Sequence, residues 1–269
     1  MAKLAAVMID AHTHLNDPRL EPNVEALLAR MQEAGVQSAL VVGYDVASSE
    51  RAVSLARQYP DVLRAAVGVH PHESRDFDAA AAAALEELAS QPEVVAIGEI
   101  GLDFHYDFSP RDAQRDAFRR QLELAARLGL PVVIHEREAV EEVLAILDAA
   151  GGWAGGGTWH CCDVTPDLAA GIARWLFIGI AGWITFPKSE GIRSLARAVP
   201  VGRLLIETDA PHLAPVPHRG KPNEPAYVRL VAEALAEVKG LPLSDLERAT
   251  TENVLRAFPR WKRVQSEEG

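Results

Sequence analysis

The stretch Ala6-Val7-Met8-Ile9-Asp10-Ala11-His12-Thr13-His14-Leu15 passes from an apolar run into an acidic residue and two alternating histidines. Residues i and i+2 of an extended strand face the same side, so His12 and His14 point together at the carboxyl end of a first predicted strand. Two imidazoles held this close, without an obvious acid for each, suit a shared divalent cation. The stretch therefore predicts a strand that leads into a metal site, and similar polar residues recur behind later apolar runs.

Apolar runs alternate with longer amphipathic segments along the chain. The runs are apolar throughout, as expected of parallel strands that are buried on both faces. Eight strand and helix units within 269 residues match the size of a (β/α)8 barrel. A doubly wound open sheet is the alternative, but it usually has its site at one crevice, whereas polar residues here follow most of the strands. The sequence therefore predicts an α/β protein with a (β/α)8 TIM barrel of the metal-dependent hydrolase type.

The predicted elements are defined by this alternation. We expect one hydrolase domain over residues 1–269, with the barrel over about 5–258 and a polar tail over 259–269. A capping box of Ser244 and Glu247 is expected to open the last helix. The predicted strands are Ala5–Asp10, Ser38–Val42, Leu63–Val69, Val94–Ile100, Pro131–Ile134, Gly157–His160, Phe177–Ala181 and Leu204–Glu207. The predicted helices are Val24–Ala34, Ser48–Tyr59, Ala79–Ser90, Ala113–Leu128, Ala139–Ala150, Pro166–Trp175, Glu190–Val199, Tyr227–Val238 and Ser244–Phe258.

Composition bounds the compartment and the partners. The formal net charge is −11, so general attraction to a polyanion is not expected, and any contact with nucleic acid needs cations or a local basic patch. The only cysteines, Cys161 and Cys162, are adjacent and unsuited to a disulfide with each other, which favours a reducing compartment. The amino terminus does not resemble a signal peptide, and no apolar segment is of membrane length. We expect a cytoplasmic protein.

Residues with metal chemistry follow five of the predicted strands. Closing a barrel would bring these strand ends round one mouth. Two-metal hydrolytic sites hold their ions roughly 3.5–4 Å apart, so a carboxylate between the two ions is expected chemistry, and Glu99 is the candidate for it. The residues are His12 and His14 after the first strand, Glu99 in the fourth, His135 after the fifth, His160 at the end of the sixth, Glu207 at the end of the eighth and Asp209 just after it.

Each of these residues has a simpler explanation when it is taken alone. A single histidine at a strand end is more often a hydrogen-bonded structural residue, Asp10 can cap a turn, and Glu207 can pair with an arginine at the edge of the core. Burying several acids and histidines together without partners would be costly, and a metal removes that cost. The set therefore favours metal ligation for His12, His14, Glu99, His135, His160 and Asp209.

The ordered motifs resemble those of the TatD-like metal-dependent deoxyribonucleases, a branch of the amidohydrolase superfamily. No single motif is decisive, but the set runs in order from residue 9 to about residue 225, and Glu252-Asn253 also fits. The motifs are Ile9-Asp10-Ala11-His12-Thr13-His14-Leu15, Gly68-Val69-His70-Pro71-His72, Gly98-Glu99-Ile100-Gly101-Leu102-Asp103, Val133-Ile134-His135-Glu136-Arg137, His160-Cys161, Glu207-Thr208-Asp209-Ala210-Pro211 and Pro215-Val216-Pro217-His218-Arg219-Gly220-Lys221-Pro222-Asn223-Glu224-Pro225.

The resemblance implies a (β/α)8 barrel that hydrolyses phosphodiester bonds, usually trimming DNA strands. It implies two divalent cations per chain, one held by His12, His14, Glu99 and Asp209 and the other by Glu99, His135 and His160. Two departures from the family pattern lie in loops at the mouth and leave the ligands intact. Glu136 stands where a small polar residue is usual, and Cys162-Asp163-Val164 replaces the usual aromatic and glycine turn.

The mechanistic hypothesis assigns a role to Asp209. Two cations would hold the scissile phosphate and lower the pKa of a water, and Asp209 would accept the proton of that water as a general base. Arg137 and Arg219 are candidates for phosphate contacts, although ion pairing for Arg137 and plain solvation for Arg219 are comparable alternatives. His70 and His72 are expected to contact substrate or to support the ligands. Trp183 and Phe186 could stack a base, but core packing is the commoner role.

Three classes of function remain open from the sequence. The first is a deoxyribonuclease, acting as an exonuclease on single-stranded or frayed DNA. The second is an amide or lactone hydrolase of the same superfamily, many of which use a carboxylated lysine where this chain has Glu99. The third is a barrel that binds metal or a partner without catalysis, which the intact ligand set with Asp209 disfavours. Magnesium, manganese and zinc all suit the ligands or the chemistry, and a monomer is the default expectation.

Overall fold

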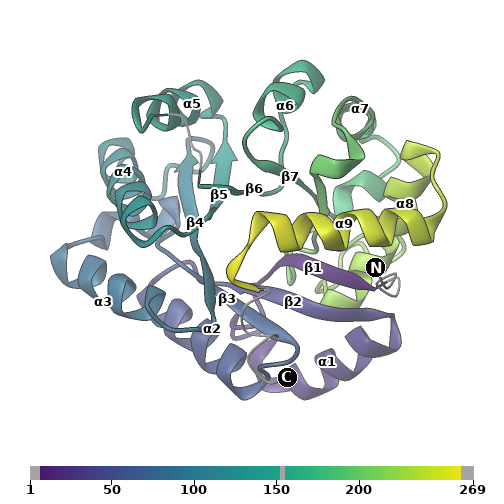
Figure 1. Cartoon of the computed structure of the whole chain (residues 1–269), viewed down its shortest axis with the longest axis horizontal. Helices are drawn as coiled ribbons and strands as arrows, with labels where there is room; N and C mark the ends of the chain where they lie inside the picture. Colours follow the sequence, from purple (N-terminus) through teal and green to yellow (C-terminus); the bar gives the residue numbers. More distant parts are fainter. Residues whose placement is uncertain (1–6, 152–154, 262–269) are drawn as a thin grey trace. The chain divides into compact units, whose positions relative to one another are not determined.

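Eight strands and the helices between them account for most of the described residues (Figure 1). The structure, a computed structural model, describes residues 7–151 and 155–261. The strands belong to one eight-stranded sheet in which their order follows the sequence, and each strand pair of known register is parallel. The strands are β1 Met8–Thr13, β2 Val36–Val42, β3 Leu63–Val67, β4 Val94–Asp103, β5 Val132–Arg137, β6 Gly157–Trp159, β7 Phe177–Ile180 and β8 Leu204–Ile206.

Helices follow the strands in regular alternation. Short 3₁₀ helices occupy several of the loops, at Glu21–Asn23, Pro71–Asp76, Gly182–Thr185, Val201–Arg203 and Pro225–Tyr227. Within the described residues, no helix is long and apolar enough to cross a membrane. The α-helices are α1 Val24–Glu33, α2 Val46–Gln58, α3 Ala79–Ala89, α4 Arg111–Leu128, α5 Val140–Ala149, α6 Pro166–Ile172, α7 Glu190–Ala198, α8 Val228–Lys239 and α9 Leu243–Ala257.

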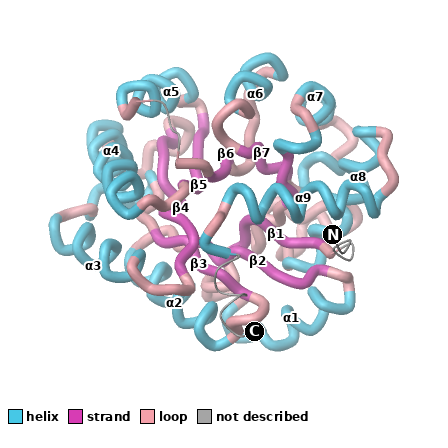
Figure 2. Tube along the Cα trace, viewed as in Figure 1, coloured by secondary structure: helices cyan, strands magenta, loops and turns pink. Residues whose placement is uncertain are grey.

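The described residues form two compact units, which we treat separately. The first unit contains residues 7–40 and 161–256, and the second contains 41–160 and 257–261. In the second unit, strands β3 to β5 lie inside a row formed by helices α2 to α5 (Figure 2). Trp261 is buried and its ring lies 6.3 Å from that of Phe258, so packing extends past the predicted barrel boundary at residue 258.

Strand β4 is the centre of the second unit. All ten of its residues are buried, which explains why its sequence is apolar apart from Glu99 and Asp103. Two buried glutamines of α4 complete the backbone hydrogen bonds beyond the strand ends. Gln114 accepts from the backbone N–H of Asp103 at 2.9 Å and donates to its carbonyl at 3.1 Å. Gln121 does the same for Val69, at 2.7 and 3.0 Å. Helix α4 thus fixes the carboxyl ends of two neighbouring strands.

In the first unit, Asp10 joins β1 to the segment after β8. Its carboxyl accepts hydrogen bonds from the backbone N–H of Thr208 at 2.9 Å and from the Thr208 hydroxyl at 2.6 Å. Burial raises the pKa of Asp10 to about 8, although the hydrogen bonds from Thr208 oppose the shift. Asn223 in turn donates to the carbonyls of Thr208 and His212, each at 2.8 Å. These buried bonds hold the loop that carries Asp209.

The observed boundaries differ from the predicted ones in an informative way. Residues 5 and 6 of the first predicted strand lie outside the described part of the chain, and β1, β4 and β5 run three residues or more past their predicted ends, into the polar residues. Helix α2 begins at Val46 because Asp45 and Ser48 form a reciprocal capping box. The capping box predicted at Ser244 is wrong, since α9 begins at Leu243 and Ser244 lies within its first turn.

Close packing at the carboxyl end of β4 generates a stability prediction. A Cβ atom at Gly101, whose φ is 147°, would overlap the backbone carbonyl of His135, whereas one at Gly129, whose φ is 61°, would meet nothing within 4 Å. We expect Gly101→Ala to lower the free energy of unfolding by at least about 3 kcal/mol. Gly129→Ala is the matched control and should cost only about 1–2 kcal/mol. Urea unfolding followed by circular dichroism measures both, and equal losses would contradict the predicted difference.

Candidate metal centre

The first unit brings His12, His14 and Asp209 together. His12 and His14 are alternate residues at the end of β1 and its continuation, and Asp209 follows β8 with a left-handed φ of 56°. The backbone N–H of Asp209 donates to the carbonyl of His12 at 2.9 Å, and that of His14 donates to the carbonyl of Ala210 at 2.7 Å. The segment after β8 is therefore fastened to β1 on both sides of the aspartate, which places its carboxylate beside the two imidazoles.

Three donor atoms converge in this group. The Nε2 atoms of His12 and His14 are 3.2 Å apart, and they lie 3.8 and 3.4 Å from Oδ1 of Asp209. Ligands about 2.1 Å from a tetrahedral cation lie about 3.4 Å from one another, so this triangle has the size expected of three ligands around one ion. All three residues also have donor types that divalent cations accept. The group fits a metal site.

The second unit brings Glu99, His135 and His70 together. Nδ1 of His135 lies 2.8 Å from Oε1 of Glu99, and Nε2 of His70 lies 3.7 Å from the same oxygen. The rings of His70 and His135 are 4.3 Å apart and meet edge to face. Nε2 of His160 also lies 3.8 Å from Oε1 of Glu99, because the backbone N–H of His160 continues the β5–β6 pairing by donating to Ile134. Three imidazole nitrogens thus surround one carboxylate oxygen.

Sequence reasoning gave no role to Asp103, which proves central to this group. Its Oδ2 lies 2.9 Å from Nε2 of His72 and 3.1 Å from Nε2 of His135. Asp103 is fully buried, so burial opposes its charge, but the hydrogen bonds with His135 and His72 leave the pKa of its carboxyl lowered. The signal was available in the sequence. Glu99 and Asp103 are four residues apart on one strand, and such residues face the same side.

The pKa values of His70 and His135 are shifted in opposite directions. Burial and the neighbouring His135 hold the pKa of His70 well below its usual value, so His70 is neutral near pH 7, and the lone pair on its Nδ1 accepts the backbone N–H of His72 at 3.1 Å. Burial also disfavours charge on His135, but its contacts with Asp103 and Glu99 prevail and raise its pKa to about 9. A site that stabilises one positive charge between two carboxylates has the polarity that a cation needs.

The predicted substrate contacts occupy different surroundings. The guanidinium of Arg137 lies over the ring of Tyr106, 4.8 Å from its centroid, and no ion pair joins it to a carboxylate within the described residues. Arg219 is exposed and lies over the ring of Phe186 at 4.1 Å in the first unit. His72 bonds to Asp103 and supports the ligand group. Glu207 accepts a hydrogen bond from the backbone N–H of Cys161 at 2.7 Å.

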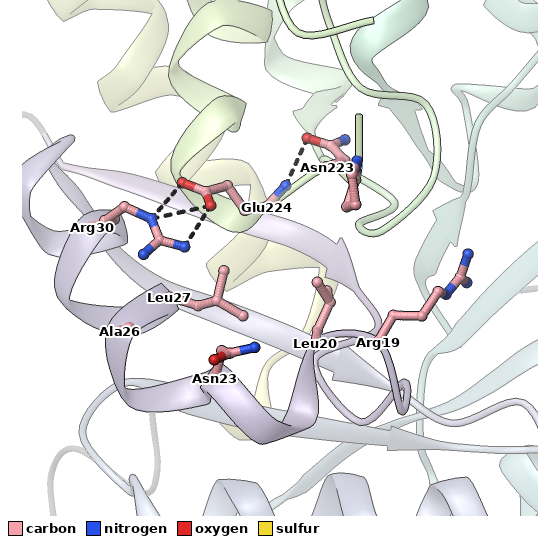
Figure 3. A pocket seen from close by; sticks show the side chains of 9 residues that line it. Arg19, Leu20, Asn23, Ala26, Leu27, Arg30, Asn223 and Glu224 are labelled. Atoms are coloured by element: carbon pink, nitrogen blue, oxygen red, sulfur yellow. Dashed lines mark hydrogen bonds and ion pairs between the residues drawn. The ribbon is translucent and has the colours of Figure 1, made fainter. Parts of the chain in front are cut away.

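A separate hollow of about 260 Å³ lies beside α1 in the first unit (Figure 3). The guanidinium of Arg30 forms a bidentate ion pair with Glu224 at one side of it, with distances of 2.7 and 2.9 Å. Arg19 lines the hollow too, and its guanidinium nitrogen is 3.0 Å from Nε2 of His212. Since the backbone N–H of His212 donates to the carbonyl of Asp209 at 2.7 Å, the hollow adjoins the loop that carries Asp209.

The fold and the two donor groups define a class: a (β/α)8 protein with metal-type ligands at the carboxyl ends of its strands. Residues 9–259 match the sequence model of the TatD related DNase family. The chain belongs to that family. The predicted family and the predicted metal-dependent hydrolase type are thereby confirmed.

Individual relatives agree with this assignment along nearly their whole length. An uncharacterized metal-dependent hydrolase, YabD of Bacillus subtilis, is 39% identical, with 94% of this chain and 99% of the relative covered. The 3′-5′ ssDNA/RNA exonuclease TatD of Erwinia tasmaniensis is 38% identical over 93% of this chain and 99% of the relative. The crystal structure of YJJV, a TatD homolog from Escherichia coli K12, superposes with a TM-score of 0.87 at 29% identity, covering 94% and 98% of the two chains. This structural likeness confirms the predicted TIM-barrel fold class.

The contacts of Asp103 generate a prediction. Asp103→Asn removes the charge that orients His135 and leaves one imidazole without its acceptor, so we expect divalent metal to bind about 10- to 100-fold more weakly. Isothermal titration with Mn²⁺ or Zn²⁺ measures the change. Asp107→Asn is the matched control, because Asp107 lies on the same segment but forms an exposed ion pair with Arg111. Equal metal affinity in wild type and Asp103→Asn would contradict the positioning role.

Proposed function

We propose that the chain is a metal-dependent exonuclease that removes nucleotides from single-stranded or frayed DNA in the 3′ to 5′ direction. The observation that carries this proposal is the convergence of nitrogen and oxygen donors in two buried groups of a TatD-family chain. The Erwinia relative, which is named for its action on ssDNA and RNA, supports the substrate class. All six predicted ligands lie in these groups, with His12, His14 and Asp209 in the first unit and Glu99, His135 and His160 in the second.

The proposal assigns two divalent cations per chain. His12, His14 and Asp209 would hold one cation in the first unit, and Glu99, His135 and His160 would hold the other in the second unit. The spacing of donors within each unit supports the ligand sets. Imidazole-rich sets suit zinc and manganese, while phosphate chemistry often uses magnesium, so all three belong in the test. Bound cations would supply charge neutralisation on the phosphate and a lower pKa for the attacking water.

The protein's own residues then have distinct tasks. The Asp209 carboxylate, 14% exposed, is fixed beside the two imidazoles by backbone bonds and can accept the proton of the attacking water. His70 is neutral because burial lowers its pKa, and its Nδ1 accepts the backbone N–H of His72 at 3.1 Å, which fixes the ring beside Glu99. Asp103 holds His135 and His72 in place, which fixes the geometry before substrate arrives. Arg137 and Arg219 are exposed and would contact phosphates of the bound strand.

The charge of the chain restricts how it would bind nucleic acid. With a net charge of −11, long-range attraction to DNA is absent, so binding should be local, confined to the ligand groups and nearby arginines, and weakened by salt. We further propose that the chain works as a monomer in the cytoplasm. The only two cysteines of the sequence, Cys161 and Cys162, are adjacent and unsuited to a disulfide with each other, which supports a reducing compartment.

Removal and restoration of metal provide the first functional prediction. Chelator-treated protein should lose nuclease activity, and one or more of Mg²⁺, Mn²⁺ and Zn²⁺ should restore it. Gel analysis of end-labelled single strands reports the direction. A 3′ label should be released at once as a mononucleotide, while a 5′-labelled strand should shorten stepwise. Equal activity with and without metal would refute the proposal, and metal-dependent cleavage of lactones or amides alone would replace it with the second hydrolase class.

The role of Asp209 provides a second prediction. Asp209→Asn removes the proton acceptor and one anionic ligand, so kcat on a single-stranded oligonucleotide should fall by a factor of at least 10²–10⁴. Circular dichroism and thermal unfolding should show that the variant remains folded. Asp245→Asn, in an exposed pair with Arg248 on α9, is the control and should retain full activity. Near-normal turnover by Asp209→Asn would remove the base assignment.

A further inference from the structure

Two aromatic rings that would normally be buried are exposed in the segment after β4. Tyr106 is 47% exposed and Phe108 is 59% exposed, and these are two of the few large apolar side chains exposed among the described residues. Their rings are stacked, with centroids 5.2 Å apart and planes only 19° from parallel. In the same segment Phe104 is buried, so the exposure is specific to this pair.

The backbone that carries the two rings is held in place. The N–H of Tyr106 donates to Oδ1 of Asp103 at 2.9 Å, and the carbonyl of Phe108 accepts from Arg75 at 2.9 Å. The hydroxyl of Ser109 donates to the carbonyl of His72 at 2.6 Å and accepts from the backbone N–H of Arg75 at 3.1 Å. Rings that are exposed on a fixed backbone present a flat surface at little cost in conformational entropy.

The stacked pair is continuous with the ligand group of the second unit. The ring of His72 meets that of Phe108 edge to face at 4.8 Å and that of Tyr106 at 5.6 Å. His72 in turn bonds to Asp103, which bonds to His135. The guanidinium of Arg137, two residues after His135, covers the Tyr106 ring. Aromatic faces, a cation and candidate metal ligands are thus joined by direct contacts within one unit.

We propose that Tyr106 and Phe108 form a stacking platform for a base of the single-stranded substrate, with Arg137 contacting a phosphate next to that base. The inference rests on the proposed nuclease function and names the residues that hold the strand. Stacking suits an exonuclease that acts on any sequence, because every base presents a π-face. It also supplies affinity that a chain of net charge −11 cannot draw from general electrostatics.

A base is favoured over another protein surface as the occupant. The patch is small, it adjoins the ligand group directly, and the cationic Arg137 lies over one of its rings, while the carboxylate of Asp107 between the two rings in sequence is paired with Arg111. A strand whose phosphate lies at the metal ligands must place the neighbouring bases within a few ångströms of that group. The stacked rings present a flat, exposed apolar surface, and this surface is connected to the ligand group because His72 contacts both Phe108 and Asp103. A second copy of the chain is the competing occupant.

The experiment compares an intact oligonucleotide with one that contains abasic residues at its 3′ end. Fluorescence anisotropy in an Asp209→Asn background, supplied with Mn²⁺, measures binding without cleavage. The unmodified platform should bind the intact strand roughly 5- to 150-fold more tightly than the abasic strand. Phe108→Ala should abolish this preference, Phe108→Leu should lose most of it, and Phe108→Trp should keep it. In otherwise wild-type protein, Phe108→Ala should raise KM for the intact strand while kcat changes little.

Controls separate the possible failures. Trp175 is 52% exposed in the first unit, and Trp175→Ala should leave the base preference unchanged. Equal binding of both strands, or a preference that survives in Phe108→Ala, would overturn the platform. Self-association that Phe108→Ala abolishes without a change in base preference would assign the surface to a second copy and also overturn it. If wild type shows a Phe108-dependent base preference but no metal-dependent cleavage, the platform stands and the nuclease proposal fails.

Discussion

The arrangement of side chains in the second unit depends on the hydrogen bonds accepted by the carboxylate of Asp103. Its Oδ2 holds His72 and His135, and its Oδ1 accepts the backbone N–H groups of His105 and Tyr106 at 3.1 and 2.9 Å. The backbone of the same residue is fixed to α4 by Gln114. One buried residue therefore connects the outer helix, the candidate metal ligands and the exposed aromatic pair. A displacement of Asp103 would move all three together.

The fold class followed from the sequence because the physical signal is repeated. Most strand residues are buried, so the strands form apolar runs in the sequence, and the runs alternate with amphipathic helices. Boundaries were harder, since they depend on single hydrogen bonds. The start of α2 is set by the Asp45 and Ser48 pair, and the end of β4 is set by Asp103. A prediction from hydrophobicity alone ends a strand at its first polar residue, even where the strand continues.

The candidate ligands were predictable because alternation along a strand determines which side chains share a face. That rule placed His12 beside His14 and could have placed Asp103 with Glu99. The rule does not extend to contacts between distant segments. Nothing in the sequence near His72 indicates that it bonds to a carboxylate 31 residues later, or that its ring packs on Phe108. Exposure of Tyr106 and Phe108 was equally hidden, because aromatic residues in a loop are usually explained by core packing.

Burial of ionisable groups gives both donor groups their chemistry. Taking carboxylates and imidazoles out of water is costly unless charges and hydrogen bonds compensate. In the first unit the cost at Asp10 is reduced by protonation, since burial raises its pKa to about 8. In the second unit a buried group is charged instead of neutral, because Glu99 and Asp103 stabilise a positive charge on His135. A divalent cation would meet the same electrostatic requirement with more charge and more ligands, and it would offset the cost of burying these residues together.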